Sequence, residues 1–320
     1  MTTSSVDPAA PTITAARPAR PKNHQYYRRH WQLYALLGLP MLYFLLFKYG
    51  PMYGVLIAFK DFNFFQGIWA SKWIGLDTFE EIFKRRDFYI ALRNTFMLNF
   101  LDLIVSFPAP IVLAIMLHEL KVSWFKKVSQ AVLYLPHFIS WVIIGGIVYQ
   151  VFATNTGIAN LLLMKMGLPA IPFLSDKNYW LLTYLGTGVW QSAGWGTIIY
   201  LAALTGINKE LYEAAEVDGA GRFTKIRYIT VPGLKPTIIT LLIMNLGHMI
   251  QIGFERPYVI GNVTVREYSE VLSTFVYKIG LQSGEYSLAT AVGFFQAVVG
   301  LVFILSANWI AKKTTEQSIL

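Results

Sequence analysis

Four polar side chains within one apolar stretch are the residues of this chain best suited to contact a polar solute. They recur three or four residues apart and comprise Asn245, His248, Gln251 and Glu255. On a helix of about 3.6 residues per turn they fall within roughly 120° of one another. Such groups are costly against lipid, by about 2.5–3.5 kcal/mol for an acidic residue. The stripe therefore predicts a helix face that lines a cavity or meets another subunit. Hydrogen bonding between helices is an equal alternative, and Glu255 could also pair with Arg256.

Covalent, metal and nucleotide chemistry find little support in the sequence. The chain has no cysteine, and its five histidines are scattered without the spacing of metal ligands. It also lacks the GxxxxGK[ST] loop that cradles the phosphates of ATP. We therefore predict no metal site, no bound cofactor and no catalytic residue, so that any ATP must be bound by a partner subunit.

A polar segment between two apolar runs, 208–232, predicts a helix, a hinge and a second helix. Asn208 can cap the first helix, and Glu213 suits its positive N-terminal end. Gly219 can take the left-handed conformation that ends a helix. A second helical run, 222–229, follows, and Pro236 is expected to open the next apolar segment. A solvated surface helix is the alternative, while the slim face of Ala214 and Ala215 would suit a groove.

The spacing in this segment resembles the EAA signature of permease subunits in bacterial ABC importers, in their carbohydrate branch. Glu213-Ala214-Ala215 is followed at the family's spacing by Gly219, Ile229 and Pro232, with Val231 where the family usually has leucine. The resemblance implies a type I importer permease whose segment docks on an ATPase through seven residues: Glu213, Ala214, Ala215, Asp218, Gly219, Ile229 and Pro232. It also implies two ATPase subunits, a second and usually different permease, an extracytoplasmic solute-binding protein and a carbohydrate substrate. Trp190 and Trp195 could then stack on sugar rings, with close helix packing as the alternative.

Composition places these elements in a lipid bilayer. Of the 320 residues, 55% are hydrophobic and 14% charged, against about 25% charged in soluble domains. Apolar runs predict an all-α protein with six transmembrane helices, at 31–59, 91–118, 128–152, 179–204, 237–260 and 286–311. The net charge of +9 lies beside the ends of these runs, where it sets orientation, and we expect no nucleic-acid partner.

The distribution of lysine and arginine predicts the topology of a multi-pass protein of the bacterial plasma membrane. It favours both termini and the 205–236 loop in the cytoplasm. We predict a disordered basic tail over 1–30, a permease domain over 31–313 and a short tail over 314–320.

Two other functional classes stay open at this point. An ion-coupled secondary transporter of a small polar solute would need more charges within the membrane and often an inverted repeat. A membrane-embedded enzyme would need convergent catalytic groups, whereas the acidic residues lie mainly in loops.

Overall fold

The computed structural model describes residues 30–315, so residues 1–29 and 316–320, which hold most of both predicted tails, lie outside it. Contacts divide the chain into two compact units at Gly54 and Val55. The first unit holds helix α2 (Trp31–Phe44), the π-turn η1 (Leu45–Tyr49) and the start of η2 (Gly50–Phe59). These turns form one apolar helical run, Trp31–Phe59, in agreement with the first predicted span.

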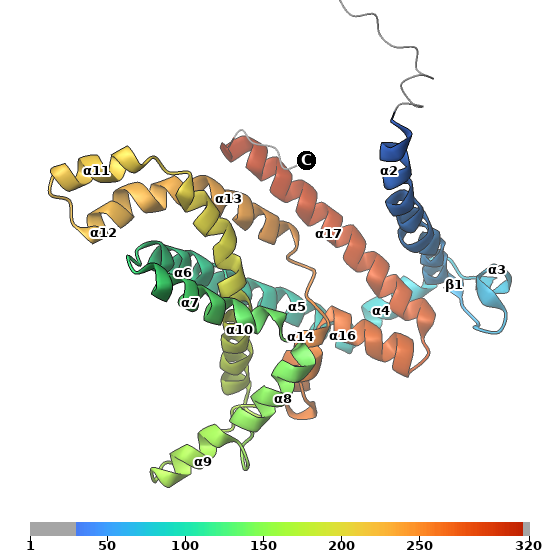
Figure 1. The fold of residues 1–320 in the computed structure, drawn as a ribbon. Coiled ribbons are helices and arrows are strands. Elements are labelled where there is room, and N and C mark those ends of the chain that lie inside the picture. Colours follow the sequence, from blue (N-terminus) through green and yellow to red (C-terminus); the bar gives the residue numbers. More distant parts are fainter. Residues whose placement is uncertain (1–29, 316–320) are drawn as a thin grey trace, which may run out of the picture. The chain divides into compact units, whose positions relative to one another are not determined.

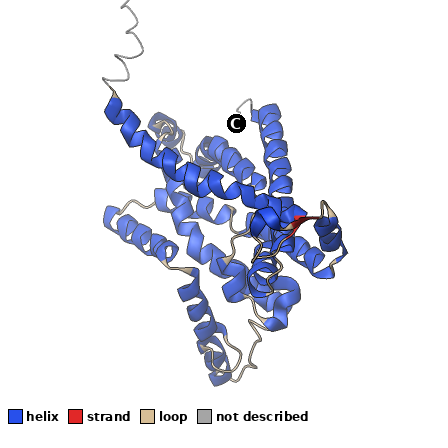
Figure 2. Ribbon diagram, turned by 90° about the vertical axis from the view of Figure 1, so that its right-hand side faces the viewer, coloured by secondary structure: helices blue, strands red, loops and turns tan. Residues whose placement is uncertain are grey.

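The described residues of the second unit are mostly helical, with one antiparallel pair of two-residue strands, drawn red in Figure 2. Its elements in chain order are β1 (Lys60–Asp61), α3 (Gly67–Ala70), β2 (Lys72–Trp73), α4 (Asp77–Lys84), α5 (Arg86–Val105), α6 (Pro108–His118), α7 (Ser123–Tyr134), η3 (Leu135–Phe138), α8 (Trp141–Phe152), α9 (Ile158–Lys165), α10 (Lys177–Thr205), α11 (Lys209–Val217), α12 (Arg222–Lys225), η4 (Ile226–Thr230), α13 (Val231–Gly247), α14 (Glu255–Ile260), η5 (Val263–Val265), α15 (Arg266–Ser269), α16 (Leu272–Tyr277), η6 (Lys278–Gln282) and α17 (Tyr286–Thr315).

Several of these helices are suited to cross a bilayer. Among the residues described, four helical stretches are long and apolar enough: Trp31–Phe59, Arg86–His118, Arg222–Gly247 and Tyr286–Trp309. The pair α7–α8 adds a fifth if its two halves form one span. Helix α10 has 29 residues, which at about 1.5 Å per residue exceeds a hydrocarbon core of about 30 Å. It is less apolar than the others, so the predicted span 179–204 agrees with the structure in length alone.

Two predicted spans are not straight helices. In 128–152 the chain bends by 101° between η3 and α8, and Ser140 caps the new helix by accepting a hydrogen bond from the Ile143 amide. In 237–260 the helix begins earlier, at Val231, and ends at Gly247, with α14 starting only at Glu255. The prediction that Pro236 opens this helix is therefore wrong, since Pro232 lies in its first turn and Pro236 in its interior.

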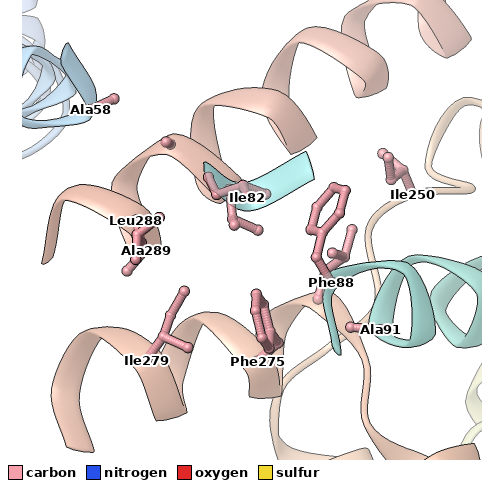
Figure 3. Packing of buried hydrophobic residues seen from close by; sticks show 12 residues of the cluster. Ala58, Ile82, Phe88, Ala91, Ile250, Phe275, Ile279, Leu288 and Ala289 are labelled. Atoms are coloured by element: carbon pink, nitrogen blue, oxygen red, sulfur yellow. The ribbon is translucent and has the colours of Figure 1, made fainter. Parts of the chain in front are cut away.

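Three larger clusters of buried apolar side chains, and a small one of Ile243 and Ala307, hold the second unit together. The cluster in Figure 3 joins α4, α5, α16 and α17 through Ile82, Phe88, Phe275 and Leu288. The other two larger clusters are arranged along α10: one packs its N-terminal half against α8 and α14, and the other packs its C-terminal half against α6 and α13. Helix α10 contacts α5, α6, α7, η3 and α13 and so lies at the centre of the helices that line the cavities described below (Figure 1).

Candidate functional site

The polar segment 208–232 folds as a helix, a tight turn and a second helix. Asn208 caps α11 by accepting a 3.0 Å hydrogen bond from the Glu210 amide, as predicted. Gly219 has φ of +74°, which confirms the left-handed hinge. The amide of Ala220 donates back to the carbonyl of Ala215 at 2.8 Å and closes the helix end. The chain then continues through α12 and η4 directly into α13.

Helix α11 is largely exposed among the described residues, with only Tyr212 and Ala215 half-buried. None of its residues is buried, and the carboxylate of Glu213 is exposed without an ion pair or side-chain hydrogen bond to any residue between 30 and 315. Val217 and, in α12, Phe223 are 89% and 86% exposed. Ile229 is half-buried and Pro232 exposed, where the segment joins α13. An acidic group among exposed apolar side chains is suited to a groove on another protein.

Two side-chain contacts join the two helices of the segment to each other, and a third fastens the segment to the rest of the chain. Tyr212 and Thr230 share a 3.0 Å hydrogen bond between their hydroxyls, and Lys225 pairs with Glu216 at 2.6 Å. Arg222 pairs at 2.7 Å with Glu119, which directly follows α6. The segment is therefore linked to the end of α6 by this pair and to α13 by the continuous chain. Figure 1 shows α11 and α12 beside each other at the end of α10.

The pair between Lys225 and Glu216 makes this attachment sensitive to acid. Lys225 lowers the pKa of the Glu216 carboxyl from its ordinary value of 4.5, through a hydrogen bond and its positive charge. A lowered carboxyl pKa stabilises the contact above pH 4.5, and this stabilisation is lost as the pH falls through the lowered pKa. We expect amide hydrogen exchange in α11, corrected for the intrinsic exchange rate, to accelerate as the pH falls through the lowered pKa of Glu216. In Glu216→Gln the plot of exchange rate against pH should lack this acceleration. Identical plots for the variant and the wild type would contradict the role given to the Lys225–Glu216 pair.

Two cavities lie side by side along α10. The first, of about 440 Å³, is lined by α5, α6, α10 and α13, and the second, of about 380 Å³, lies against α14. Four residues line both: Asn99, Asp102, Gln251 and Arg256.

The break between α13 and α14 shapes these cavities. Two carbonyls freed by the break accept side-chain hydrogen bonds from other helices. Asn99 of α5 donates to Met249 at 2.8 Å, and Gln296 of α17 donates to Ile250 at 2.9 Å. Because the freed carbonyls have partners, the non-helical stretch is stable at membrane depth, where such backbone lines a cavity.

The predicted solute-contacting residues reach two different places. Asn245, His248 and Gln251 line the first cavity, and Gln251 and Glu255 line the second. The prediction of one continuous helical stripe is wrong, because α13 ends at Gly247 and the last three of these residues lie beyond it. The break in the helix nevertheless leaves all four side chains lining the cavities.

The two predicted tryptophans lie away from these cavities. Trp190 lines a separate apolar cavity of about 420 Å³ between α8 and α10. Trp195 stacks on the ring of His137, with centroids 4.6 Å apart and planes at 4°. Its neighbour Gly194 faces the backbone of Leu133 so closely that no Cβ would fit, which confirms close packing there.

An ion pair that the sequence reasoning did not identify lines both cavities. Arg256 pairs with Asp102 of α5 at 2.7 Å, and not with Glu255. The available signal was that Asp102 and Arg256 are among the few charged residues inside the predicted spans, where charges are rare and usually paired. Among residues 30–315 no cluster of histidine, cysteine, aspartate and glutamate is arranged to hold a metal ion.

Residues 88–316 match the family of the binding-protein-dependent transport system inner membrane component. The chain belongs to this family. It is 44% identical over 292 residues to Protein LplB of Bacillus subtilis (strain 168), covering 91% of this chain and 92% of that protein. It is 43% identical over 287 residues to the polygalacturonan/rhamnogalacturonan transport system permease protein YteP of the same organism, covering 90% and 89%.

A solved structure supports the same assignment at the level of the fold. The chain superposes with a TM-score of 0.83 and 39% identity on a chain in the crystal structure of a bacterial alginate ABC transporter in complex with an alginate pentasaccharide-bound periplasmic protein, covering 92% of this chain and 99% of that one. The permease therefore has the type I importer fold predicted from its motif, and it is a membrane-embedded transport subunit.

Proposed function

We propose that this permease is the membrane subunit of an ATP-driven importer of oligosaccharides, and that α11 docks on a separate ATPase. The exposed surface of α11 carries this proposal, because Glu213, which has no side-chain partner among residues 30–315, lies near exposed apolar side chains that a complementary surface would cover. The seven residues of the EAA signature would make or support that contact. The chain itself would bind no cofactor, and ATP would be bound by the partner.

The substrate class follows from the relatives. One relative is named for polygalacturonan and rhamnogalacturonan transport, and the superposed structure holds an alginate pentasaccharide on its periplasmic protein. We infer an oligosaccharide delivered by an extracytoplasmic solute-binding protein to a path enclosed with a second permease. Asn245, His248, Gln251 and Glu255 would contact it, since all four line the two cavities along α10.

Orientation follows from the position of α11. If it meets an ATPase in the cytoplasm, the first cavity, near the α11 end of α10, faces the cytoplasm and the second faces outward. Both termini would then be cytoplasmic. The family's description as binding-protein-dependent favours this importer over the ion-coupled alternative.

Reconstitution tests the proposed activity. The complex is purified with its partners and placed in liposomes with its binding protein. Labelled tetragalacturonate and labelled tetramannuronate are the probes. The liposomes should accumulate at least one of them, and only when ATP is present. Accumulation driven by a proton or sodium gradient without ATP would contradict the proposal and support the secondary transporter.

A further inference from the structure

The guanidinium of Arg256 occupies a tightly defined seat. Its two terminal nitrogens donate to the two carboxylate oxygens of Asp102, at 2.7 and 3.2 Å. One of them also donates to the Tyr184 carbonyl at 2.5 Å, and the group lies 3.7 Å over the Tyr184 ring. The side chains of Arg256 and Asp102 are 14% and 21% exposed. A forked pair so little exposed to water is both strong and directional.

A glycine of α10 makes room for this seat. A Cβ atom at Gly188 would collide with the guanidinium carbon and both terminal nitrogens of Arg256. At Gly186, on the same helix, a Cβ would meet nothing within 4 Å. Alanine at 188 would therefore displace Arg256 without changing any charge.

The pair stands between the two cavities along α10. On the first side the cavity is lined by Ser192, Gly196 and Tyr200, towards the end of α10 that leads to α11. On the second side it is lined by Tyr184, nearer the start of α10. Asp102 and Arg256 belong to both linings, together with Asn99 and Gln251, so a solute moving directly from one cavity to the other within this chain would pass this group of four residues.

Two features suit the pair to opening. Arg256 is the second residue of α14 and lies next to the non-helical stretch between α13 and α14, which is held by few backbone–backbone hydrogen bonds besides the side-chain contacts of Asn99 and Gln296. Its Nε is buried without a hydrogen-bond acceptor among the described residues, so the network is incompletely satisfied. A polar network with every member satisfied would be rigid, whereas this one retains an unused donor.

We propose that the Asp102–Arg256 pair is the gate between the two cavities, closed in this structure and broken when the path opens. The inference rests on the proposed transport function and adds the residues that separate its two compartments. Substrate passage then requires Arg256 to leave its seat against Gly188.

Cysteine accessibility tests the gate, because the chain has no native cysteine. Ser192→Cys places a thiol of nearly native size in the first cavity, and Gly253→Cys places one in the second, where a Cβ meets nothing within 4 Å. Each variant of the full complex is treated with a membrane-impermeant methanethiosulfonate in vesicles of either orientation. With the pair intact, each thiol should react from one face only, and the two faces should be opposite.

Displacing Arg256 should remove this one-sidedness. In Gly188→Ala, and in the double variant Asp102→Asn with Arg256→Gln, both thiols should react from both faces. The labelling rate of each thiol from the face that the intact pair blocks should rise by about tenfold or more. Gly186→Ala is the matched control and should behave as wild type. Blocked rates that stay unchanged in Gly188→Ala, or thiols that react from the same face with the pair intact, would overturn the proposal.

The readout separates this inference from the proposed function. Thiol labelling needs neither ATP nor a known sugar, whereas the importer is tested by ATP-driven accumulation. Accumulation together with unchanged labelling in Gly188→Ala would overturn the gate alone. Gated labelling in a complex that takes up solute without ATP would overturn the importer alone.

Discussion

Gly219→Val should uncouple ATP hydrolysis from uptake, whereas Gly221→Val should not. The two glycines flank the same turn, and a Cβ at either meets nothing within 4 Å. They differ in backbone conformation, with φ of +74° at Gly219 and −68° at Gly221. A β-branched residue is strongly disfavoured at positive φ, so valine at 219 must rebuild the hinge.

The effect on uptake should be large because the turn at Gly219 fixes the position of α11 relative to α12. The left-handed conformation costs a non-glycine residue about 1–2 kcal/mol, and a rearranged turn would also move Glu213 away from its partner. In reconstituted complexes we expect uptake to fall by about tenfold or more. Equal amounts of both variants in the membrane would establish normal insertion. Equal uptake by the two variants would contradict a rigid hinge.

Asp102→Ala should be the most destabilising single change in the path. It leaves the guanidinium of Arg256 in a largely desolvated seat without its carboxylate. Removing one partner of a buried pair lowers the free energy of unfolding by about 3–5 kcal/mol. Tryptophan fluorescence during denaturation of the detergent-solubilised permease measures this change.

The matched control removes both charges. Asp102→Asn combined with Arg256→Gln leaves no uncompensated charge. The free energy of unfolding of this double variant should therefore be closer to that of the wild type than the value for Asp102→Ala is. A single variant as stable as the double variant would show that water reaches Arg256, and the seat would then not be a low-dielectric one.

The features that the sequence predicts well depend on neighbouring residues. The cap of α11 joins Asn208 to an amide two residues away, and the hinge depends on one glycine. The apolar runs likewise predict the long helices from local composition. Such features are fixed by chemistry within one or two turns, so they can be read from a single sequence.

The features that the sequence does not predict depend on distant partners. The break after Gly247 is stable because Asn99, 150 residues from the carbonyl it satisfies, reaches across from α5. The Asp102–Arg256 pair spans 154 residues. A helical wheel assumes that the whole apolar run is one helix. It therefore predicts that Gln251 and Glu255 share a helix face with Asn245, whereas α13 ends at Gly247.

Co-purification tests the central claim most directly. The tagged permease is extracted gently from its native membrane, as wild type and as Glu213→Lys combined with Gly219→Trp, and the recovered subunits are identified by mass spectrometry. The wild type should bring an ATPase and a second permease, and the variant should retain the second permease but lose the ATPase. Wild-type permease recovered without an ATPase, while other membrane complexes stay intact, would contradict the account.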